Sequence, residues 1–302
     1  MTNRRRFLAI SAAAFAFPGT SKAEPIYTWQ GTALGARASL RLAHPDAKAI
    51  SIRVAAEISR LEDIFSLYRN SSALSQLNRA GTLQAPPFEL LGCLSLAGAV
   101  HRASGGRFDP TIQPLWNSYA QASANGTLPE PRALRAARAL TDWAGVTLSP
   151  AAITMRSGMA LTLNGIAQGY IADRVAEMLN AEGLRNILIN TGEFRALGTH
   201  PDGNAWPVRL AAGGEVPLAA RALATSAPLG TTFDEGAQMG HILDPRTGLP
   251  ARTKWREITI SAESAAVADA LSTAACLFET RADLRVCLAR FQGVRLEAVS
   301  VV

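Results

Sequence analysis

The stretch that most constrains the fold is 161–173, with the sequence Leu-Thr-Leu-Asn-Gly-Ile-Ala-Gln-Gly-Tyr-Ile-Ala-Asp. Residues 160–164 alternate apolar and polar side chains, which predicts a strand. After the Asn-Gly pair at 164–165 the apolar residues recur at helical spacing, which predicts a helix that Gly183 ends. The run Ile-Leu-Ile at 187–189 then predicts a buried strand.

The start of this predicted helix has chemical consequences. A helix that begins at a glycine turn presents unpaired N–H groups and the positive end of its dipole, and both attract phosphate. The corner could therefore hold a nucleotide. From these residues alone, an ordinary strand-turn-helix without a ligand remains the alternative.

The charge of the chain argues against a nucleic-acid partner. The 302 residues are 48% hydrophobic, which is enough for a substantial core, and carry a formal net charge of +6. Four of the basic residues lie in the first 23 positions, where there is no acid, so residues 24–302 carry a net charge of +2. No basic stripe interleaved with aromatic residues follows.

Residues 1–23 have the pattern of a twin-arginine signal peptide. Asn-Arg-Arg-Arg-Phe-Leu at 3–8 precedes an apolar run at 8–17 and a Ser-Lys-Ala cleavage signal at 21–23. The apolar run is too short to cross a bilayer, which disfavours a membrane anchor. We expect export to the bacterial periplasm and a mature domain over 24–302.

Three cysteines, Cys93, Cys276 and Cys287, show no spacing typical of a metal site. Their apolar surroundings indicate buried thiols. A Cys276–Cys287 disulfide is the alternative in an oxidising compartment.

The remaining elements follow from hydrophobic periodicity. We expect a surface loop over 122–131, because its residues are small, polar or proline. Helices are predicted over 46–65, 88–103, 131–143 and 262–278, and strands over 29–42, 146–154, 206–211, 216–219, 255–261 and 294–301.

Several polar motifs are candidates for function. Tyr68 follows a predicted helix and could stack on a planar ligand, or be a half-buried core aromatic. Asp109 follows a double glycine and could point outward or cap a turn. His241 can move protons near neutral pH, whereas Asp244 and Arg246 can pair to hold their turn.

The last candidate pair lies on the small-residue helix. Asp269 and Thr273 are four residues apart, so one helix face presents a carboxylate and a hydroxyl oxygen to a hard cation. A threonine hydroxyl bonded back to a helix carbonyl is the alternative.

Taken in order, these motifs resemble the ApbE family from about residue 28 to the C-terminus. The resemblance implies an α+β fold of two intimately packed lobes, with mixed or antiparallel sheets and flanking helices. It is carried by Gly-Thr at 31–32, Phe-Ser-Leu-Tyr at 65–68, Phe-Asp-Pro-Thr at 108–111, the corner at 163–173, Ala-Thr-Ser at 224–226, His-Ile-Leu-Asp-Pro-Arg-Thr-Gly at 241–248 and Ala-Asp-Ala-Leu-Ser-Thr-Ala at 268–274.

The resemblance implies a magnesium-dependent FAD:protein FMN transferase. Such an enzyme splits FAD, links FMN through a phosphoester to a threonine or serine of a partner protein, and releases AMP. The chemistry is consistent with a metal, because a pyrophosphate repels an incoming nucleophile until a cation neutralises its oxygens.

Family roles can be carried over to matching positions. The resemblance implies that His241 takes the proton from the acceptor hydroxyl. Asp269, Thr273 and the backbone carbonyl of Ala167 are implied to hold Mg²⁺. The implied FAD contacts are Tyr68, Arg107, Phe108, Asp109, Thr162, Gln168 and Ile242.

The chain also departs from the family pattern. Gln30 stands in place of the usual methionine and Thr162 in place of the usual aspartate, and 227–230 lacks the common Gly-Asp-Tyr. With the twin-arginine signal, these changes resemble a NosX-like branch whose acceptor is a membrane-associated redox subunit. Two other functions remain open: an FAD pyrophosphatase that releases FMN and AMP, and a non-catalytic FAD-binding maturation factor.

Overall fold

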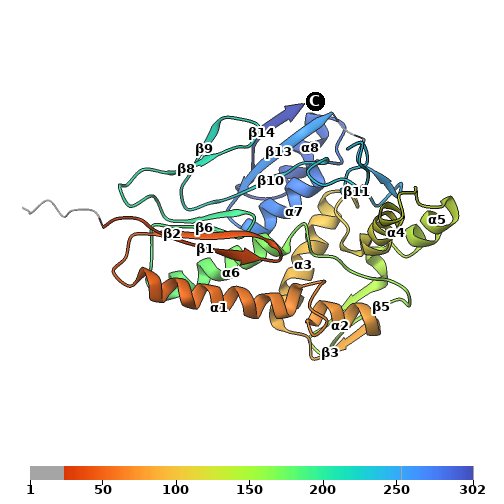
Figure 1. Ribbon diagram of the computed structural model, residues 1–302, viewed down its shortest axis with the longest axis horizontal. Coiled ribbons are helices and arrows are strands. Elements are labelled where there is room, and N and C mark those ends of the chain that lie inside the picture. Colours follow the sequence, from red (N-terminus) through yellow and green to blue (C-terminus); the bar gives the residue numbers. More distant parts are fainter. Residues whose placement is uncertain (1–23, 253, 302) are drawn as a thin grey trace, which may run out of the picture.

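The computed structural model describes residues 24–252 and 254–301, so the predicted signal peptide lies outside the described residues. Its centre is one sheet whose neighbouring strands all pair antiparallel (Figure 1). The strands, in spatial order, are β1 (Tyr27–Ala33), β2 (Ala36–Leu42), β6 (Ile187–Asn190), β7 (Phe194–Leu197), β10 (Ala222–Ser226), β13 (Trp255–Ala262) and β14 (Arg295–Val301).

Helices cover one face of this sheet. They are α1 (Ala47–Phe65), α3 (Phe88–Ala103), α6 (Ala167–Ala181) and α7 (Ala265–Ala275), with α8 (Arg281–Leu288) beside β14. Ile187 and Ile189 of β6 belong to the large core formed with these helices. Leu188 faces the other side and packs on the hairpin β8 (Trp206–Arg209) and β9 (Glu215–Leu218). The continuous apolar run thus reflects burial on both faces.

A second lobe lies beside the helices and carries smaller antiparallel sheets. A separate core of Leu115, Tyr119, Ala137, Phe233 and Leu243 holds part of it together. The elements on this side are α2 (Ala73–Ala80), β3 (Thr82–Gln84), α4 (Gln113–Ala124), α5 (Pro131–Ala139), β4 (Val146–Leu148), β5 (Ala152–Met155), β11 (Leu243–Asp244) and β12 (Leu249–Pro250), with two 3₁₀ turns at Pro110–Ile112 and Trp143–Gly145. Of these, α2 and β5 contribute buried residues to the large core and so join the two lobes. The predicted α+β fold of two packed lobes is confirmed.

The strand predicted over 160–164 is wrong. The Asn78 side chain of α2 occupies both backbone groups of Leu161, donating to its carbonyl and accepting from its N–H at 2.8 Å each. The N–H of Thr162 donates to the Pro110 carbonyl at 2.8 Å. The segment belongs to no sheet, and its alternating pattern reflects the burial of Leu161 and Leu163.

Several boundaries also differ from the predictions. The helix predicted over 262–278 begins later, because β13 continues to Ala262 and the Ser264 hydroxyl accepts the Val267 N–H as an N-cap. The helix predicted over 131–143 ends at Ala139, since Asp142 caps the next 3₁₀ turn. The helices α2, α4 and α8 were not predicted, and α4 takes up the start of the loop predicted over 122–131.

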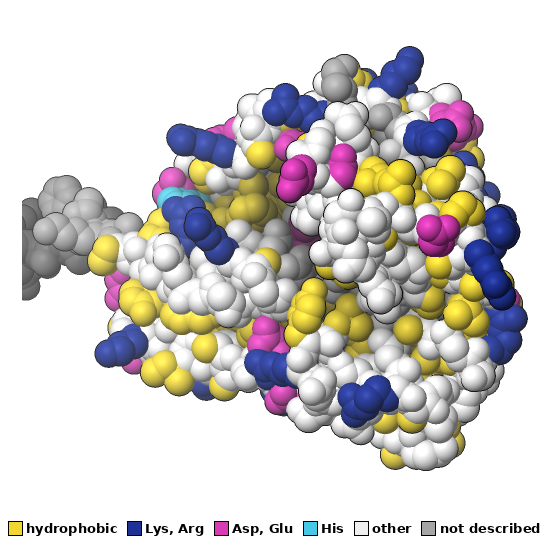
Figure 2. Space-filling model, turned by 45° about the vertical axis from the view of Figure 1, so that its right-hand side comes forward, with side chains coloured by type: hydrophobic (Ala, Val, Ile, Leu, Met, Phe, Trp, Pro, Cys, Tyr) yellow, Lys and Arg dark blue, Asp and Glu magenta, His cyan; other side chains and the backbone are white. Residues whose placement is uncertain are grey.

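The three cysteines are free and buried, so the alternative of a Cys276–Cys287 disulfide is wrong. Within the described residues, no helix combines the length and the apolar character that crossing a membrane requires. Basic and acidic side chains are interspersed over the face shown in Figure 2, as the small net charge of residues 24–302 leads one to expect.

Candidate functional site

A cavity of about 390 Å³ lies where α6, α7 and β10 meet the segment that follows α3. Nine of the eleven predicted site residues line it, from positions far apart in the sequence. They are Arg107, Phe108, Asp109, Thr162, Gln168, His241, Ile242, Asp269 and Thr273. Tyr68 and Ala167 are not among its lining residues.

Two glycines allow α6 and α7 to approach each other at one wall of the cavity. A Cβ at Gly169 would lie 2.3 Å from the Ala265 carbonyl oxygen, so only glycine fits there. A Cβ at Gly165 would lie 2.8 Å from the Thr273 hydroxyl oxygen. The glycine corner therefore brings the backbone at 165–169 directly against the helix that carries Asp269 and Thr273.

The N–H groups at the start of α6 are more fully used than the sequence predicts. Those of Ile166 and Ala167 donate to the Leu163 carbonyl, at 3.0 and 2.8 Å. The N–H of Gly169 donates to Asp269 Oδ2 at 3.1 Å. The corner thus serves mainly to position the side chains of α7 at the cavity. Few of its N–H groups are left free to bind phosphate.

Asp269 is the most conspicuous charge at this wall. Its side chain is buried, and among the described residues the Gly169 N–H is its one hydrogen-bond donor. Burial raises the pKa of Asp269 to about 7. A buried carboxylate with so little compensation is costly when ionised, unless a cation lies beside it.

A second carboxylate, that of Glu193, lines the same cavity and was not predicted as a site residue. Its Oε2 accepts the Thr225 N–H at 3.2 Å. Burial, reinforced by the negative charge of Asp269, raises the pKa of Glu193 well above its usual value. The available signal was the polar turn that follows the buried strand β6, where the sequence reads Asn-Thr-Gly-Glu.

The Thr273 hydroxyl faces the cavity. The back-bond to the helix carbonyl that was the alternative for Thr273 is made by its neighbour Ser272, whose hydroxyl donates to the Asp269 carbonyl at 2.9 Å. The nearest hydroxyl to Thr273 Oγ1 is that of Ser226, at 3.4 Å. Asp269 and Thr273 therefore present two hard oxygen donors to one space.

Ala167, the third predicted metal ligand, lies inside the glycine corner. It is buried as the first residue of α6, between Gly165, which adjoins Thr273, and Gly169, which bonds Asp269. Gly165 lines the cavity whereas Ala167 does not. The corner thus adjoins the predicted ligands, with Gly165 packed so closely on Thr273 that a Cβ there would lie 2.8 Å from its hydroxyl oxygen.

His241 has a defined tautomer. Its Nδ1 lies 3.0 Å from the Thr231 carbonyl oxygen, which can only accept, so Nδ1 carries the proton and Nε2 keeps its lone pair. Burial lowers the pKa of His241, so the ring is neutral at pH 7. A neutral imidazole with a free nitrogen at the cavity wall can act as a base.

Asp244 and Arg246 hold the turn after His241, as predicted. Arg246 Nε and Nη2 donate to the two carboxylate oxygens of Asp244 at 2.9 and 2.7 Å. This pairing lowers the pKa of Asp244.

Arg107 is held in place at the cavity by three neighbours. Its guanidinium lies 4.2 Å from the centre of the Phe278 ring, and it donates to the carbonyl oxygens of Leu277 and Ser104 at 3.2 and 3.1 Å. The cation is therefore oriented before any ligand arrives.

Asp109 is buried and caps a turn, which was one of its two predicted interpretations, and its contact with FAD stays a prediction. Its Oδ1 accepts the N–H and the hydroxyl of Thr111, at 2.9 and 2.6 Å, which caps a 3₁₀ turn. Its Oδ2 lies 3.5 Å from His101 Nδ1, and the residue also lines the cavity.

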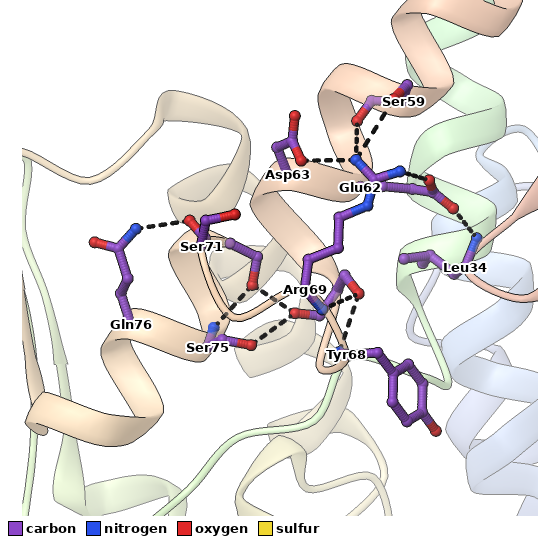
Figure 3. A network of polar contacts seen from close by, with 11 residues as sticks. Leu34, Ser59, Glu62, Asp63, Tyr68, Arg69, Ser71, Ser75 and Gln76 are labelled. Atoms are coloured by element: carbon purple, nitrogen blue, oxygen red, sulfur yellow. Dashed lines mark hydrogen bonds and ion pairs between the residues drawn. The ribbon is translucent and has the colours of Figure 1, made fainter.

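Tyr68 lies away from this arrangement. Figure 3 shows its ring pointing away from the polar network that Arg69 forms with Glu62 and Asp63, and the side chain is 79% exposed. The Ser66 hydroxyl accepts the Tyr68 N–H at 3.1 Å and fixes the backbone there. Tyr68 is neither the core aromatic of the alternative interpretation nor a wall of the cavity, and its contact with FAD stays a prediction.

The fold and the cavity define a class of protein: an α+β protein with buried acids, a hydroxyl and a neutral histidine around one space suited to phosphate-ester chemistry. The particular family follows from comparison. The sequence model of the ApbE family matches residues 34–296, and the chain belongs to this family.

Similar proteins and structures agree with this assignment. The FAD:protein FMN transferase of Treponema pallidum (strain Nichols) is 31% identical over 274 residues, covering 74% of this chain and 73% of that protein. That of Klebsiella pneumoniae (strain 342) is 29% identical over 247 residues, covering 78% and 77%.

Two solved structures share the fold. The ApbE protein of Thermotoga maritima superposes with a TM-score of 0.79 at 24% identity, covering 92% of this chain and 97% of that one. The flavinyl transferase ApbE of Pseudomonas stutzeri in its apo form also gives 0.79 at 24% identity, covering 88% and 89%.

Proposed function

We propose that this protein is an FAD:protein FMN transferase, which moves FMN from FAD to a threonine or serine hydroxyl of a partner protein. The observation that carries the proposal is the meeting of Asp269, Thr273 and the glycine corner with His241 around one cavity. The similar proteins of Treponema pallidum and Klebsiella pneumoniae bear the same name, which supports it.

The donor set around Asp269 fits Mg²⁺. A carboxylate, a hydroxyl and a main-chain carbonyl are the hard oxygen ligands that this ion prefers. Three of the described acids, Asp109, Glu193 and Asp269, line the cavity. Its two described basic residues are a neutral His241 and an Arg107 that donates to carbonyls. A divalent cation would balance this negative charge.

In the proposal Asp269 and Thr273 hold the ion together with a main-chain oxygen of the corner, either from Ala167, as the family match implies, or from Gly165. When bound, Mg²⁺ withdraws charge from the pyrophosphate oxygens of FAD. The side chains of Arg107 and Gln168 and the apolar Phe108 and Ile242 line the space for the substrate.

His241 has the proton-transfer role in this proposal. The acceptor hydroxyl gives its proton to Nε2 as its oxygen attacks the phosphorus of the FMN half. The bond from that phosphorus to the bridging oxygen breaks, and AMP leaves with the bridging oxygen. The bond between Nδ1 and the Thr231 carbonyl keeps Nε2 turned away from that carbonyl and available to the substrate.

Incubation with FAD, Mg²⁺ and a threonine-bearing acceptor tests the proposal. We expect covalent flavin on the acceptor and one AMP for each flavin transferred, with neither product when EDTA is added. Free FMN and AMP without covalent flavin would favour the FAD pyrophosphatase. Intact FAD would favour the non-catalytic maturation factor.

We also propose a periplasmic location, reached by the twin-arginine route, and an acceptor on a membrane-associated redox subunit. The Arg-Arg-Arg-Phe-Leu run at 4–8 supports the route. With Arg4 and Arg5 replaced by lysine, the protein should stay in the cytoplasm, which cell fractionation measures. Mass spectrometry of membrane proteins from cells with and without the gene would identify the acceptor through its added flavin.

A further inference from the structure

We propose that Ser226 is a positioning residue, which turns the lone pairs of the Thr273 hydroxyl toward the cation. This inference rests on the proposed function, since it assigns Thr273 to a metal. Ser226 is the last residue of β10, lines the cavity and belongs to the Ala-Thr-Ser motif, for which the mechanism above has no role.

Three hydroxyls, those of Ser226, Ser272 and Thr273, form a hydrogen-bonded series at the cavity wall. Ser226 Oγ lies 2.7 Å from Ser272 Oγ and 3.4 Å from Thr273 Oγ1. Ser272 Oγ lies 2.9 Å from the Asp269 carbonyl oxygen. Each hydroxyl has one proton to donate, so the group at the end of this series fixes which hydroxyl donates and which accepts.

This series of hydrogen bonds ends at the Asp269 carbonyl, which can only accept. The Ser272 hydroxyl therefore donates its proton to the Asp269 carbonyl and accepts a hydrogen bond from Ser226. The Ser226 hydroxyl in turn donates its proton to Ser272, so its oxygen can only accept a hydrogen bond from Thr273. The Thr273 proton is drawn to Ser226, and the free lone pairs of Thr273 Oγ1 are left for the cavity.

This direction suits a metal ligand. A hydroxyl binds a cation through its oxygen lone pairs, whereas a proton turned toward the ion repels it. Groups that orient a ligand in this way, without touching the metal, typically change metal affinity 10- to 100-fold when removed. The link from Thr273 to Ser226 is the longest of the series, so we expect the low end of that range.

The position of Ser226 is itself well fixed. It pairs with Ile258 of β13 in the central sheet. The preceding residue, Thr225, donates its N–H to Glu193 on another wall of the cavity. The end of β10 thus contacts Glu193 through Thr225, and Ser272 and Thr273 through Ser226. A change at Ser226 that keeps the backbone leaves the Glu193 contact intact.

The test is a titration of the FAD-free protein with Mn²⁺, in which electron paramagnetic resonance measures the concentration of free Mn²⁺. Ser226→Ala should weaken Mn²⁺ binding about tenfold. Ser272→Ala should also weaken it, because the Ser226 proton is then free to turn to Thr273. Ser226→Thr, which keeps the hydroxyl, should restore most of the affinity.

Ser118→Ala is the matched control. It removes a half-buried hydroxyl that donates to the Pro114 carbonyl within α4, away from the cavity, and should leave Mn²⁺ binding unchanged. The metal-free melting temperatures of all variants show whether any effect is merely structural. A tenfold loss in Ser226→Ala with an unchanged melting temperature supports the proposal.

Two results would overturn it in different ways. If Ser226→Ala binds Mn²⁺ as the parent chain does while Asp269→Ala does not, Ser226 has no positioning role and the proposed metal site stands. If Asp269→Ala also binds normally, the metal site of the proposed function fails, and this proposal with it.

Discussion

Two aspartates at the contact between α6 and α7 differ in how fully the protein satisfies them. Asp173 of α6 caps the start of α7: its carboxylate accepts the Ser264 hydroxyl at 2.7 Å and the N–H groups of Ala265 and Ala266 at 2.8 and 3.0 Å. Arg195 Nε lies 3.3 Å away. Asp269 of α7 faces the start of α6 and accepts one N–H, that of Gly169.

The difference separates a structural acid from a functional one. Burial raises the pKa of Asp173, which lines a separate cavity, but three hydrogen bonds and Arg195 oppose this rise. These contacts join the two helices. The carboxylate of Asp269 lines a cavity and lacks such compensation, so it is suited to a ligand that arrives later. The predictions below test this contrast, beginning with the largest effect.

Asp269→Asn should lower the rate of flavin transfer at least about a thousandfold, because the amide cannot supply the charge that holds the metal. The fold should survive, since the one hydrogen bond from Gly169 can pass to the amide oxygen. Covalent flavin on the acceptor and circular dichroism measure the two properties. Transfer at the parent rate would contradict the role of Asp269.

The stability of the metal-free chain should fall as the pH rises from about 4 to 7. The pKa of Asp269 is about 7 in the folded chain and near 3.8 otherwise, so between these values only the unfolded state has lost the proton. The contribution of Asp269 is full below about pH 4, is lost through pH 7, and amounts to at most about 4 kcal/mol. The free energy of unfolding, measured with urea at several pH values, should depend less steeply on pH in Asp269→Asn than in the parent chain. An equal dependence on pH in both would contradict this cause.

Asp173→Ala should destabilise the fold by about 3 kcal/mol, because it removes the cap of α7 and leaves buried N–H groups without an acceptor. Transfer per folded molecule should change little at low temperature. Urea unfolding and the transfer assay together measure this. A stable Asp173→Ala chain with no activity would reverse the contrast between the two acids.

His241→Gln should lower the transfer rate about a hundredfold at pH 7 and leave Mn²⁺ affinity unchanged. Burial lowers the pKa of His241, so the parent rate should hold at neutral pH and drop only as the pH falls through that lowered pKa. The variant should lack this acidic limb. A pH–rate profile with the same limb in both chains would assign the base elsewhere.

The elements that position the site were accessible from sequence because they depend on local pattern. The helical spacing after Gly165 predicts α6, and the separation of Asp269 and Thr273 by one turn of helix places both on the face that lines the cavity. The resemblance to the ApbE family supplied the pairing of this helix face with the corner at 163–173, which periodicity alone does not contain.

What the sequence did not reveal depends on contacts between distant residues. Asn78 takes the backbone bonds of Leu161 across 83 positions, so an alternating segment never joins a sheet. Glu193 lines the cavity and accepts the N–H of Thr225, which is 32 positions away, and this contact is not visible in the sequence. Tyr68 carries a family motif, yet its side chain is 79% exposed and does not line the cavity, which the motif alone does not reveal.

The most direct test of the account is a crystal structure with FAD and Mn²⁺, in which anomalous scattering locates the metal. We predict one peak at about 2.0–2.4 Å from both the Asp269 carboxylate and the Thr273 hydroxyl, with the FAD pyrophosphate on its open side. A peak at Asp173, or FAD bound in the cavity with no metal at Asp269, would contradict the central claim.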